Sequence, residues 1–113
     1  MIRKHAPNIR HALVFHNGTL AGHLLKNSKR YVFFYDKKYR ESKSPSIALN
    51  MPKKQRIFSS PYMFAYFQGL LPEGENKTFY CKQANISPTD KFSMLVELAQ
   101  HETIGAITVK EIK

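Results

Sequence analysis

The chain has 113 residues, a length that suits one domain with a single core and leaves little surplus for a deep catalytic cleft. Hydrophobic residues make up 42% of the sequence, which excludes a disordered chain, and the only cysteine is Cys81, which excludes an internal disulfide and fits a reducing cytosol. No stretch approaches the roughly 20 apolar residues of a membrane span, and the N-terminus lacks the apolar run of a signal peptide. We therefore expect a cytoplasmic protein that makes no contact with a membrane.

The formal net charge of +10 is concentrated in the first half of the chain. Residues 1–57 hold 13 Lys and Arg against 2 acids, a balance of +11, whereas residues 58–113 hold 5 Lys against 6 acids, a balance of −1. A basic half beside a nearly neutral half favours an acidic partner, either nucleic acid or an acidic protein surface. A solvated sheet edge, on which lysines discourage strand-to-strand aggregation, explains the same pattern without a partner.

Residues 1–10 are interpreted as a short basic arm and residues 11–113 as a single domain. Within the domain, Asn17-Gly18 lies between two apolar runs. This is the strongest short-range signal of a β-hairpin, because both central residues of a type I′ turn need a positive φ. The pattern predicts two antiparallel strands, over residues 11–16 and 19–25.

Two further strands are predicted before the first helix. Residues 30–35 are β-branched and aromatic, which is typical of a strand, and residues 36–45 are polar and charged, which predicts a loop. In residues 47–52 large apolar residues alternate with small or polar ones, the period of a half-buried strand, and Pro52 ends the strand because proline removes a ladder donor. Residues 53–56 are predicted to form a basic loop.

Helices are predicted to follow this loop. Ser60-Pro61 predicts the start of a helix that runs to about Gln68, because serine is a good N-cap and proline suits the first helical position. A second short helix is predicted over residues 75–84. Asn85 is expected at its end in the left-handed conformation that often terminates a helix.

A third helix is predicted after Ser87-Pro88, which repeats the start signal, with Asp90 in the reciprocal position of a capping box. Its apolar face is formed by residues spaced at i, i+3, i+4 and i+7, namely Phe92, Leu95, Val96 and Ala99. Residues 105–110 alternate, with Ile107 and Val109 on one side, and predict a last strand that returns to the sheet. Strands segregated from helices indicate an α+β class, with a mainly antiparallel sheet of about five strands and about three helices before the last strand.

The helix predicted after Pro61 carries a wide apolar stripe. Core packing against the sheet explains the stripe without a partner, and its members are Met63, Phe64, Tyr66, Phe67, Leu70 and Leu71. Tyr62, Ala65 and Gln68 fall on the opposite side of this helix. Tyr62 is therefore predicted to be exposed, and exposed tyrosines are favoured at interfaces because they contribute a large area at small entropic cost.

The sequence contains no motif for catalysis, nucleotide binding or metal coordination. None of the histidines pairs with Cys81 or with an acid at metal-ligand spacing, and all are interpreted as satisfied or surface side chains: His5, His11, His16, His23 and His101. The hairpin can bring His16 and His23 together, as a cross-strand pair rather than a site. Cys81 is interpreted as a small buried hydrophobe. We therefore expect neither an enzyme nor a protein that needs a cofactor or a metal.

Several short motifs follow one another between residues 11 and 110. They are Val14-x-x-Asn17-Gly18-x-x-x-Gly22, Phe33-x-Tyr35-Asp36, Ile47-x-Leu49-x-Met51-Pro52, Phe64-x-x-Phe67-x-x-Leu70-Leu71-Pro72-Glu73-Gly74, Ser87-x-x-x-x-Phe92-x-x-Leu95 and Gly105-Ala106-Ile107. In these motifs and their order, nearly the whole chain resembles the N-terminal subdomain of the HipA-type serine/threonine kinase toxins.

The resemblance implies a function. In the fused members of the family a kinase body with an ATP loop and a catalytic Asp follows this subdomain, and this sequence contains no such segments, so it resembles the stand-alone, HipS-like form of HipBST three-component systems. The resemblance implies a non-catalytic antitoxin that binds and neutralises a HipT-like serine/threonine kinase toxin, with a HipB-like DNA-binding protein in a larger complex. We expect partner contacts from Tyr62, Gln68 and Glu73, around the helix and the Pro-Glu-Gly turn.

Two alternatives stay open. The first is a small basic nucleic-acid-binding protein that uses its positive half for phosphate contacts, although the sequence has no helix-turn-helix, RRM or KH signature. Its basic face would comprise Lys29, Arg30, Lys37, Lys38, Lys53, Lys54 and Arg56, together with Arg3 and Lys4 of the arm. The second alternative is a fragment of a longer HipA-type kinase.

Overall fold

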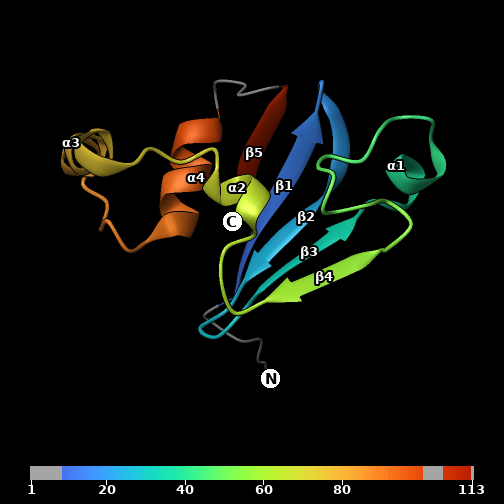
Figure 1. Cartoon of the computed structure of the whole chain (residues 1–113), viewed down its shortest axis with the longest axis horizontal. Coiled ribbons are helices and arrows are strands. Elements are labelled where there is room, and N and C mark those ends of the chain that lie inside the picture. The colour runs from blue at the N-terminus through green and yellow to red at the C-terminus, as the bar shows by residue number, and fades with distance from the viewer. Residues whose placement is uncertain (1–8, 101–105, 113) are drawn as a thin grey trace.

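The computed structural model describes residues 9–100 and 106–112, which form a five-stranded antiparallel sheet with helices packed against it (Figure 1). The strands are β1 (Arg10–His16), β2 (Thr19–Lys26), β3 (Tyr31–Tyr35), β4 (Ile57–Ser60) and β5 (Ile107–Ile112). The helices are α1 (Lys37–Glu41), α2 (Ala65–Gln68), α3 (Gly74–Ala84) and α4 (Lys91–Ala99). The sheet order is β4-β3-β2-β1-β5, so the last strand returns to lie beside the first. The predicted α+β class is confirmed, with α2, α3 and α4 before the last strand and α1 in addition.

The predicted Asn-Gly hairpin is confirmed. Asn17 and Gly18 join β1 to β2 with φ angles of 51° and 81°, positive as a type I′ turn requires. The register shifts between Val14 and Phe15, where a β-bulge leaves Ala21 as the extra residue of β2. The hairpin thus forms the centre of the sheet, with β3 pairing on one side and β5 on the other.

A short helix occupies part of the segment predicted as a loop, residues 36–45, so that prediction was wrong there. Asp36 caps α1, because its carboxylate accepts hydrogen bonds from the backbone N–H groups of Lys38 and Tyr39 at 3.1 and 3.3 Å. The ring of Tyr39 is buried, and its hydroxyl donates to the carbonyl of Pro45 at 2.7 Å. A helix of five residues is too short to show an apolar period, which is why the sequence pattern missed it.

The fourth strand is Ile57–Ser60, and the prediction of a strand over residues 47–52 was wrong. Ile47 and Met51 are buried, as the alternation indicated, but the chain between them folds into a turn. The hydroxyl of Tyr35 holds both ends of this turn, because it donates to the carbonyl of Met51 and accepts from the N–H of Ile47 at 3.1 Å. The sequence pattern thus predicted the burial of Ile47 and Met51 correctly, but it predicted the wrong backbone conformation between them.

The helix predicted from Ser60-Pro61 begins later and is only one turn long. Ser60 pairs with Tyr31 in the β3–β4 ladder, so it cannot serve as a helix N-cap. Phe64, immediately before α2, has an extended backbone with ψ of 140°. The segment between β4 and α2 is therefore not helical, and α2 comprises only the last four residues of the predicted helix.

The two later helices agree more closely with the predictions. Asn85 ends α3 in the left-handed conformation, with φ of 58°, as expected. The N-cap of α4 is Asp90, whose carboxylate accepts from the N–H of Ser93 at 3.1 Å, so the assignment of Ser87 as the cap was wrong. The hydroxyl of Ser87 instead lies 2.9 Å from that of Thr89, within the turn that precedes the helix.

The core lies between one face of the sheet and the helices. Its fully buried aromatic rings come from four elements: Phe33 and Tyr35 of β3, Tyr39 of α1, Phe67 of α2 and Phe92 of α4. The predicted stripe after Pro61 belongs to this core, since its members are either buried or packed partly against it. The predicted face of α4 is buried except for half-buried Val96, and Ile107 and Val109 of β5 are buried as expected.

Some predictions concern residues outside the described ranges. The arm, residues 1–10, lies outside them except for its last two residues, and Arg10 is the first residue of β1. His5, His101 and Gly105 also lie outside the described residues. Within residues 9–100 and 106–112, no helix is long and apolar enough to cross a membrane.

Candidate partner-binding surface

The segment that joins β4 to α3 carries the three predicted contact residues, and apolar side chains anchor it to the sheet. Met63, Phe67 and Leu71 are buried in the core. The ring centroid of Phe67 lies 5.9 Å from that of Phe33 in β3 and 5.4 Å from that of Tyr66. Because these anchors fix the backbone, the side chains that point outward from the segment are presented in defined positions.

The predicted contact residues lie at three points along this segment. Tyr62 is 76% exposed, as predicted, and its N–H donates to the hydroxyl of Ser60 at 3.0 Å, which fixes the chain just after β4. Gln68 is the last residue of α2 and is half-buried. Glu73 occupies the N-cap position of α3, where its side chain is exposed and makes no capping hydrogen bond. The segment therefore offers an aromatic ring, an amide and a carboxylate to a partner.

The residues of the predicted basic face lie at both ends of β3 rather than at one place. The members before β3 are Lys29 and Arg30, and the members at its other end are Lys37, Lys38, Lys53, Lys54 and Arg56. In the second group, the segment that carries Arg56 lies beside the end of β3, because the N–H of Tyr35 donates to the carbonyl of Arg56 at 3.0 Å. This separation gives no support to a single phosphate-binding surface.

Lys53 is engaged within the protein. Its ammonium group donates to the carbonyls of Tyr39 at 3.0 Å, Ser42 at 2.8 Å and Ser44, and it lies 5.2 Å from the ring centroid of Tyr39. These contacts close the chain around the end of α1. A phosphate group would have to displace them in order to bind the amine.

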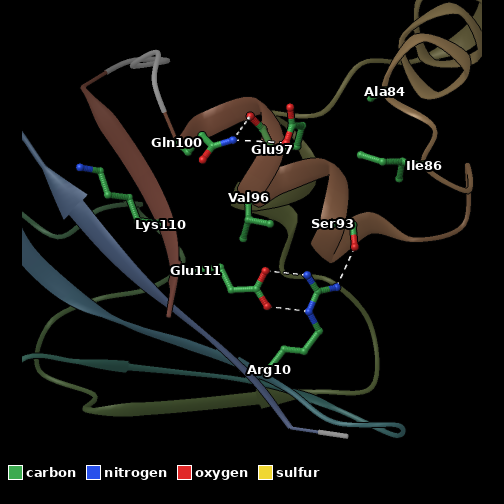
Figure 2. A pocket seen from close by; sticks show the side chains of 9 residues that line it. All are labelled: Arg10, Ala84, Ile86, Ser93, Val96, Glu97, Gln100, Lys110 and Glu111. Atoms are coloured by element: carbon green, nitrogen blue, oxygen red, sulfur yellow. Dashed lines mark hydrogen bonds and ion pairs between the residues drawn. The ribbon is translucent and has the colours of Figure 1, made fainter. Parts of the chain in front are cut away.

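A pocket of about 540 Å³ lies between α4, the end of α3 and β5, and Figure 2 shows the side chains that line it. In it, Nε and Nη2 of Arg10 donate to the two carboxylate oxygens of Glu111 at 2.8 and 2.7 Å, and Nη1 donates to the hydroxyl of Ser93 at 2.7 Å. The guanidinium carbon lies 4.7 Å from the ring centroid of Phe92. The hydrogen bonds to Glu111 raise the pKa of Arg10. Because these groups are paired with one another, the pocket is a structural junction between β1, β5 and α4.

The histidines of the hairpin pair differently from the prediction. His23 Nδ1 lies 2.8 Å from Nε2 of His11, whereas His16 Nδ1 lies 2.7 Å from the hydroxyl of Tyr39, so the predicted pairing of His16 with His23 was wrong. The side chains of His16 and His23 point to opposite faces of the sheet, because the bulge changes the alternation of β2 relative to β1. No group of three or more His, Cys, Asp or Glu side chains among the described residues is arranged to hold a metal ion.

The structure also shows features that the sequence analysis did not single out. Phe79 of α3 is 67% exposed, and Leu49, in the turn after Ile47, is fully exposed. The adjacent aromatic residues Phe79 and Tyr80 in a largely polar helix were the available signal, because two neighbouring residues of a helix cannot both face the core. Cys81 is buried, as predicted, with its sulfur 3.4 Å from that of Met94.

Residues 12–110 match the family model described as the HipA N-terminal domain. An uncharacterized protein of Haemophilus influenzae is 30% identical over 105 residues, which cover 93% of this chain and 95% of that protein. A solved structure, described as the N-terminal domain of HipA toxin, has a TM-score of 0.70 and 25% identity, covering 99% of this chain and 98% of that one. The chain therefore belongs to the HipA N-terminal domain family, as the order of its motifs indicated.

Proposed function

We propose that this protein is a non-catalytic, HipS-like antitoxin that binds and neutralises a HipT-like serine/threonine kinase toxin. The observation that carries the proposal is the extent of the match with the Haemophilus influenzae relative, which covers 95% of that protein. In that relative the domain makes up almost the entire protein, rather than the first part of a kinase. A separate domain of this kind supports a role in trans, on a kinase that lacks it.

The proposed mechanism needs a surface from this chain and no chemistry. In a fused kinase the domain and the kinase body belong to one chain, so their contact is intramolecular. A separate domain would occupy the same docking surface on the kinase, and it would inhibit either by blocking access to the kinase site or by holding the kinase in an inactive shape. A HipB-like DNA-binding protein would join the two in a larger complex.

The segment between β4 and α3 is the first candidate for the contact. Tyr62 has the exposed aromatic ring that commonly anchors an interface, at a small entropic cost because a tyrosine side chain has few rotatable bonds. Glu73 offers an exposed carboxylate for a cationic group of the kinase, and the amide of Gln68 can hydrogen-bond beside it. Buried Phe67 and Leu71 hold these groups on a fixed backbone.

Co-expression with a HipT-like serine/threonine kinase tests the proposal. We expect the protein to restore growth of cells that express the kinase and to co-purify with it. Tyr62→Ala should weaken the complex about thirtyfold, because truncating a central aromatic anchor typically costs about 2 kcal/mol. The dissociation constant of the purified complex is the measurement.

Phe79→Ala is the matched control, since it also removes an exposed aromatic ring but lies outside the segment, on α3. It should leave the dissociation constant unchanged. Unrelieved toxicity together with no co-purification would overturn the proposal. If the same preparation shifted duplex DNA in a salt-sensitive manner, the nucleic-acid-binding alternative would replace it.

A further inference from the structure

The face of the sheet that points away from the core is apolar. Alternation along the strands brings one set of side chains to this side, which we call the outer face. Its members are His11, Leu13 and Phe15 of β1, Leu20, His23 and Leu25 of β2, Val32 and Phe34 of β3, Ile57 and Ser59 of β4, and Thr108, Lys110 and Ile112 of β5. Most of them are aliphatic or aromatic, and they run across all five strands from one edge to the other.

The outer face is separate from the core of the domain. None of its apolar members belongs to the buried core or to the half-buried side chains that pack against it. Within the face, the ring of His23 stacks on that of Phe34, with ring centroids 4.7 Å apart. At the two edges of the sheet, Ile57 and Ile112 are exposed.

This composition differs from that of an ordinary solvated sheet face. An antiparallel sheet with one face on a core normally alternates apolar residues inside with polar residues outside. Here Leu13, Leu25 and Val32 stand where polar residues are expected, in the centre of the sheet. These central side chains are half-buried, and Ile57 and Ile112 at the edges are exposed, so an apolar surface continues across the sheet. Such a surface marks an interaction site.

The charges of the outer face indicate the kind of partner. Its members include no Asp or Glu, and its only permanent charge is that of Lys110, whose ammonium group lies 5.9 Å from the ring centroid of Phe15. At the opposite edge of the sheet, Nε of Arg30 donates to the hydroxyl of Ser59 at 2.8 Å, so a second cationic group borders the face. A second copy of this chain would bring two positively charged surfaces together, whereas an apolar surface bordered by carboxylates would be attracted.

We propose that the outer face is a docking surface for the kinase toxin, which presents to it an apolar patch bordered by carboxylates. This inference rests on the proposed antitoxin function and adds a second contact area to the segment that carries Tyr62. The two areas are neighbours along the chain, because Ile57 and Ser59 of the outer face lie in β4, and Tyr62 comes two residues after the end of that strand. One partner can therefore cover both.

Leu13→Glu is the test variant. Leu13 pairs with His23 on one side and with Lys110 on the other, so a carboxylate at this position has a cationic neighbour and solvent in the free protein. The fold should therefore tolerate the change. In the complex the same carboxylate would be buried against an apolar patch, and we expect the dissociation constant for the kinase to rise about tenfold or more.

Leu49→Glu is the matched control, because it makes the same substitution at a fully exposed leucine outside the outer face. It should leave kinase binding unchanged. Circular dichroism and urea unfolding of both variants establish that they are folded. If Leu13→Glu proves unfolded, Val32→Thr together with Leu25→Thr replaces it, since threonine keeps the preference for a strand and removes apolar area from the same face.

The outcomes separate this inference from the proposed function. If the wild-type protein neutralises the kinase, and folded Leu13→Glu binds as tightly as wild type, the outer face is not the docking surface while the antitoxin function stands. If the wild-type protein fails to bind the kinase at all, the proposed function and this inference fall together. A wild-type dimer in light scattering that Leu13→Glu converts to a monomer would assign the face to a second copy and overturn the proposal.

Discussion

At the scale of single residues, the His11–His23 pair is the most unusual contact of the sheet. Nδ1 of His23 lies within hydrogen-bond distance of Nε2 of His11, at 2.8 Å. The ring of His23 also stacks on that of Phe34, with an interplanar angle of 13°. Burial lowers the pKa of His23, and the charge of protonated His11 lowers it further, while Asp36 opposes the effect. The neutral form of His23 is therefore favoured in the folded protein.

This gives a prediction for the pH dependence of stability. Because the pKa of His23 is lower in the folded protein than its value of about 6.5 in an unfolded chain, the unfolded state takes up more protons as pH falls. The free energy of unfolding should therefore decrease from pH 7 to pH 5, as measured by urea unfolding. In His23→Gln the decrease over this range should be smaller. Equal pH dependence of the two proteins would contradict the assignment.

At the scale of elements, the central strands approach one another closely at Gly22. This glycine of β2 is paired with Val14 of β1 and Tyr35 of β3. A Cβ atom at this position would lie 2.5 Å from the carbonyl oxygen of Phe34 and 2.7 Å from ring atom Cζ of Phe33. The ring of Phe33 therefore packs directly over the backbone of β2, next to the bulge at Ala21.

Gly22→Ala should destabilise the protein by about 1–3 kcal/mol or more, the usual cost of overpacking, because the backbone oxygen cannot move aside. Urea unfolding measures the change. Gly69→Ala is the matched control, since its Cβ would lie 3.4 Å from the nearest atom and its φ of −66° is ordinary, so it should be neutral or slightly stabilising. An unchanged midpoint for Gly22→Ala would show that Phe33 is not held over this position.

At the scale of the whole molecule, Arg10 and Glu111 join the first strand to the last. Figure 2 shows their bidentate pair and the bond from Arg10 to Ser93. Together with the contact between Arg10 and Phe92, these bonds connect β1, β5 and α4 at one point. The side chains are 35% and 15% exposed, so water screens the pair less than it screens an ion pair on the open surface. Bidentate geometry adds strength beyond that of a single contact.

A double-mutant cycle with Arg10→Met and Glu111→Gln should therefore give a coupling free energy of about 1–2 kcal/mol in urea unfolding. Methionine keeps much of the apolar stem that packs on Phe92, so the cycle isolates the charge-assisted hydrogen bonds. The same cycle with Glu97→Gln in place of Glu111→Gln is the control and should be additive, because Glu97 makes no hydrogen bond with Arg10. Additive effects in both cycles would show that the ion pair between Arg10 and Glu111 does not stabilise the pairing of β1 with β5.

For the candidate partner-binding surface, the sequence predicted which residue is exposed, but it did not predict the surface to which such residues belong. Periodicity placed Tyr62 outward and Phe67 inward, and both placements agree with the structure, although α2 is shorter than the pattern indicated. The outer face could not be recognised from the sequence. Leu13, Leu25 and Val32 look like core residues in isolation, and only the pairing of the strands shows that they share the side away from the helices.

The sequence by itself determined the parts of the fold that local chemistry controls. Asn17-Gly18 required a tight hairpin because few other residues accept positive φ, Asn85 ended a helix for the same reason, and alternation placed Ile107 and Val109 in the core. Tertiary structure decided the parts of the fold in which segments far apart in the sequence compete for the same position in the sheet. Residues 47–52 fit a strand locally, but the hydroxyl of Tyr35 holds them in a turn, and β4 takes the place beside β3. The local pattern indicated the burial of Ile47 and Met51, whereas strand pairing depends on which distant segment satisfies the free backbone edge.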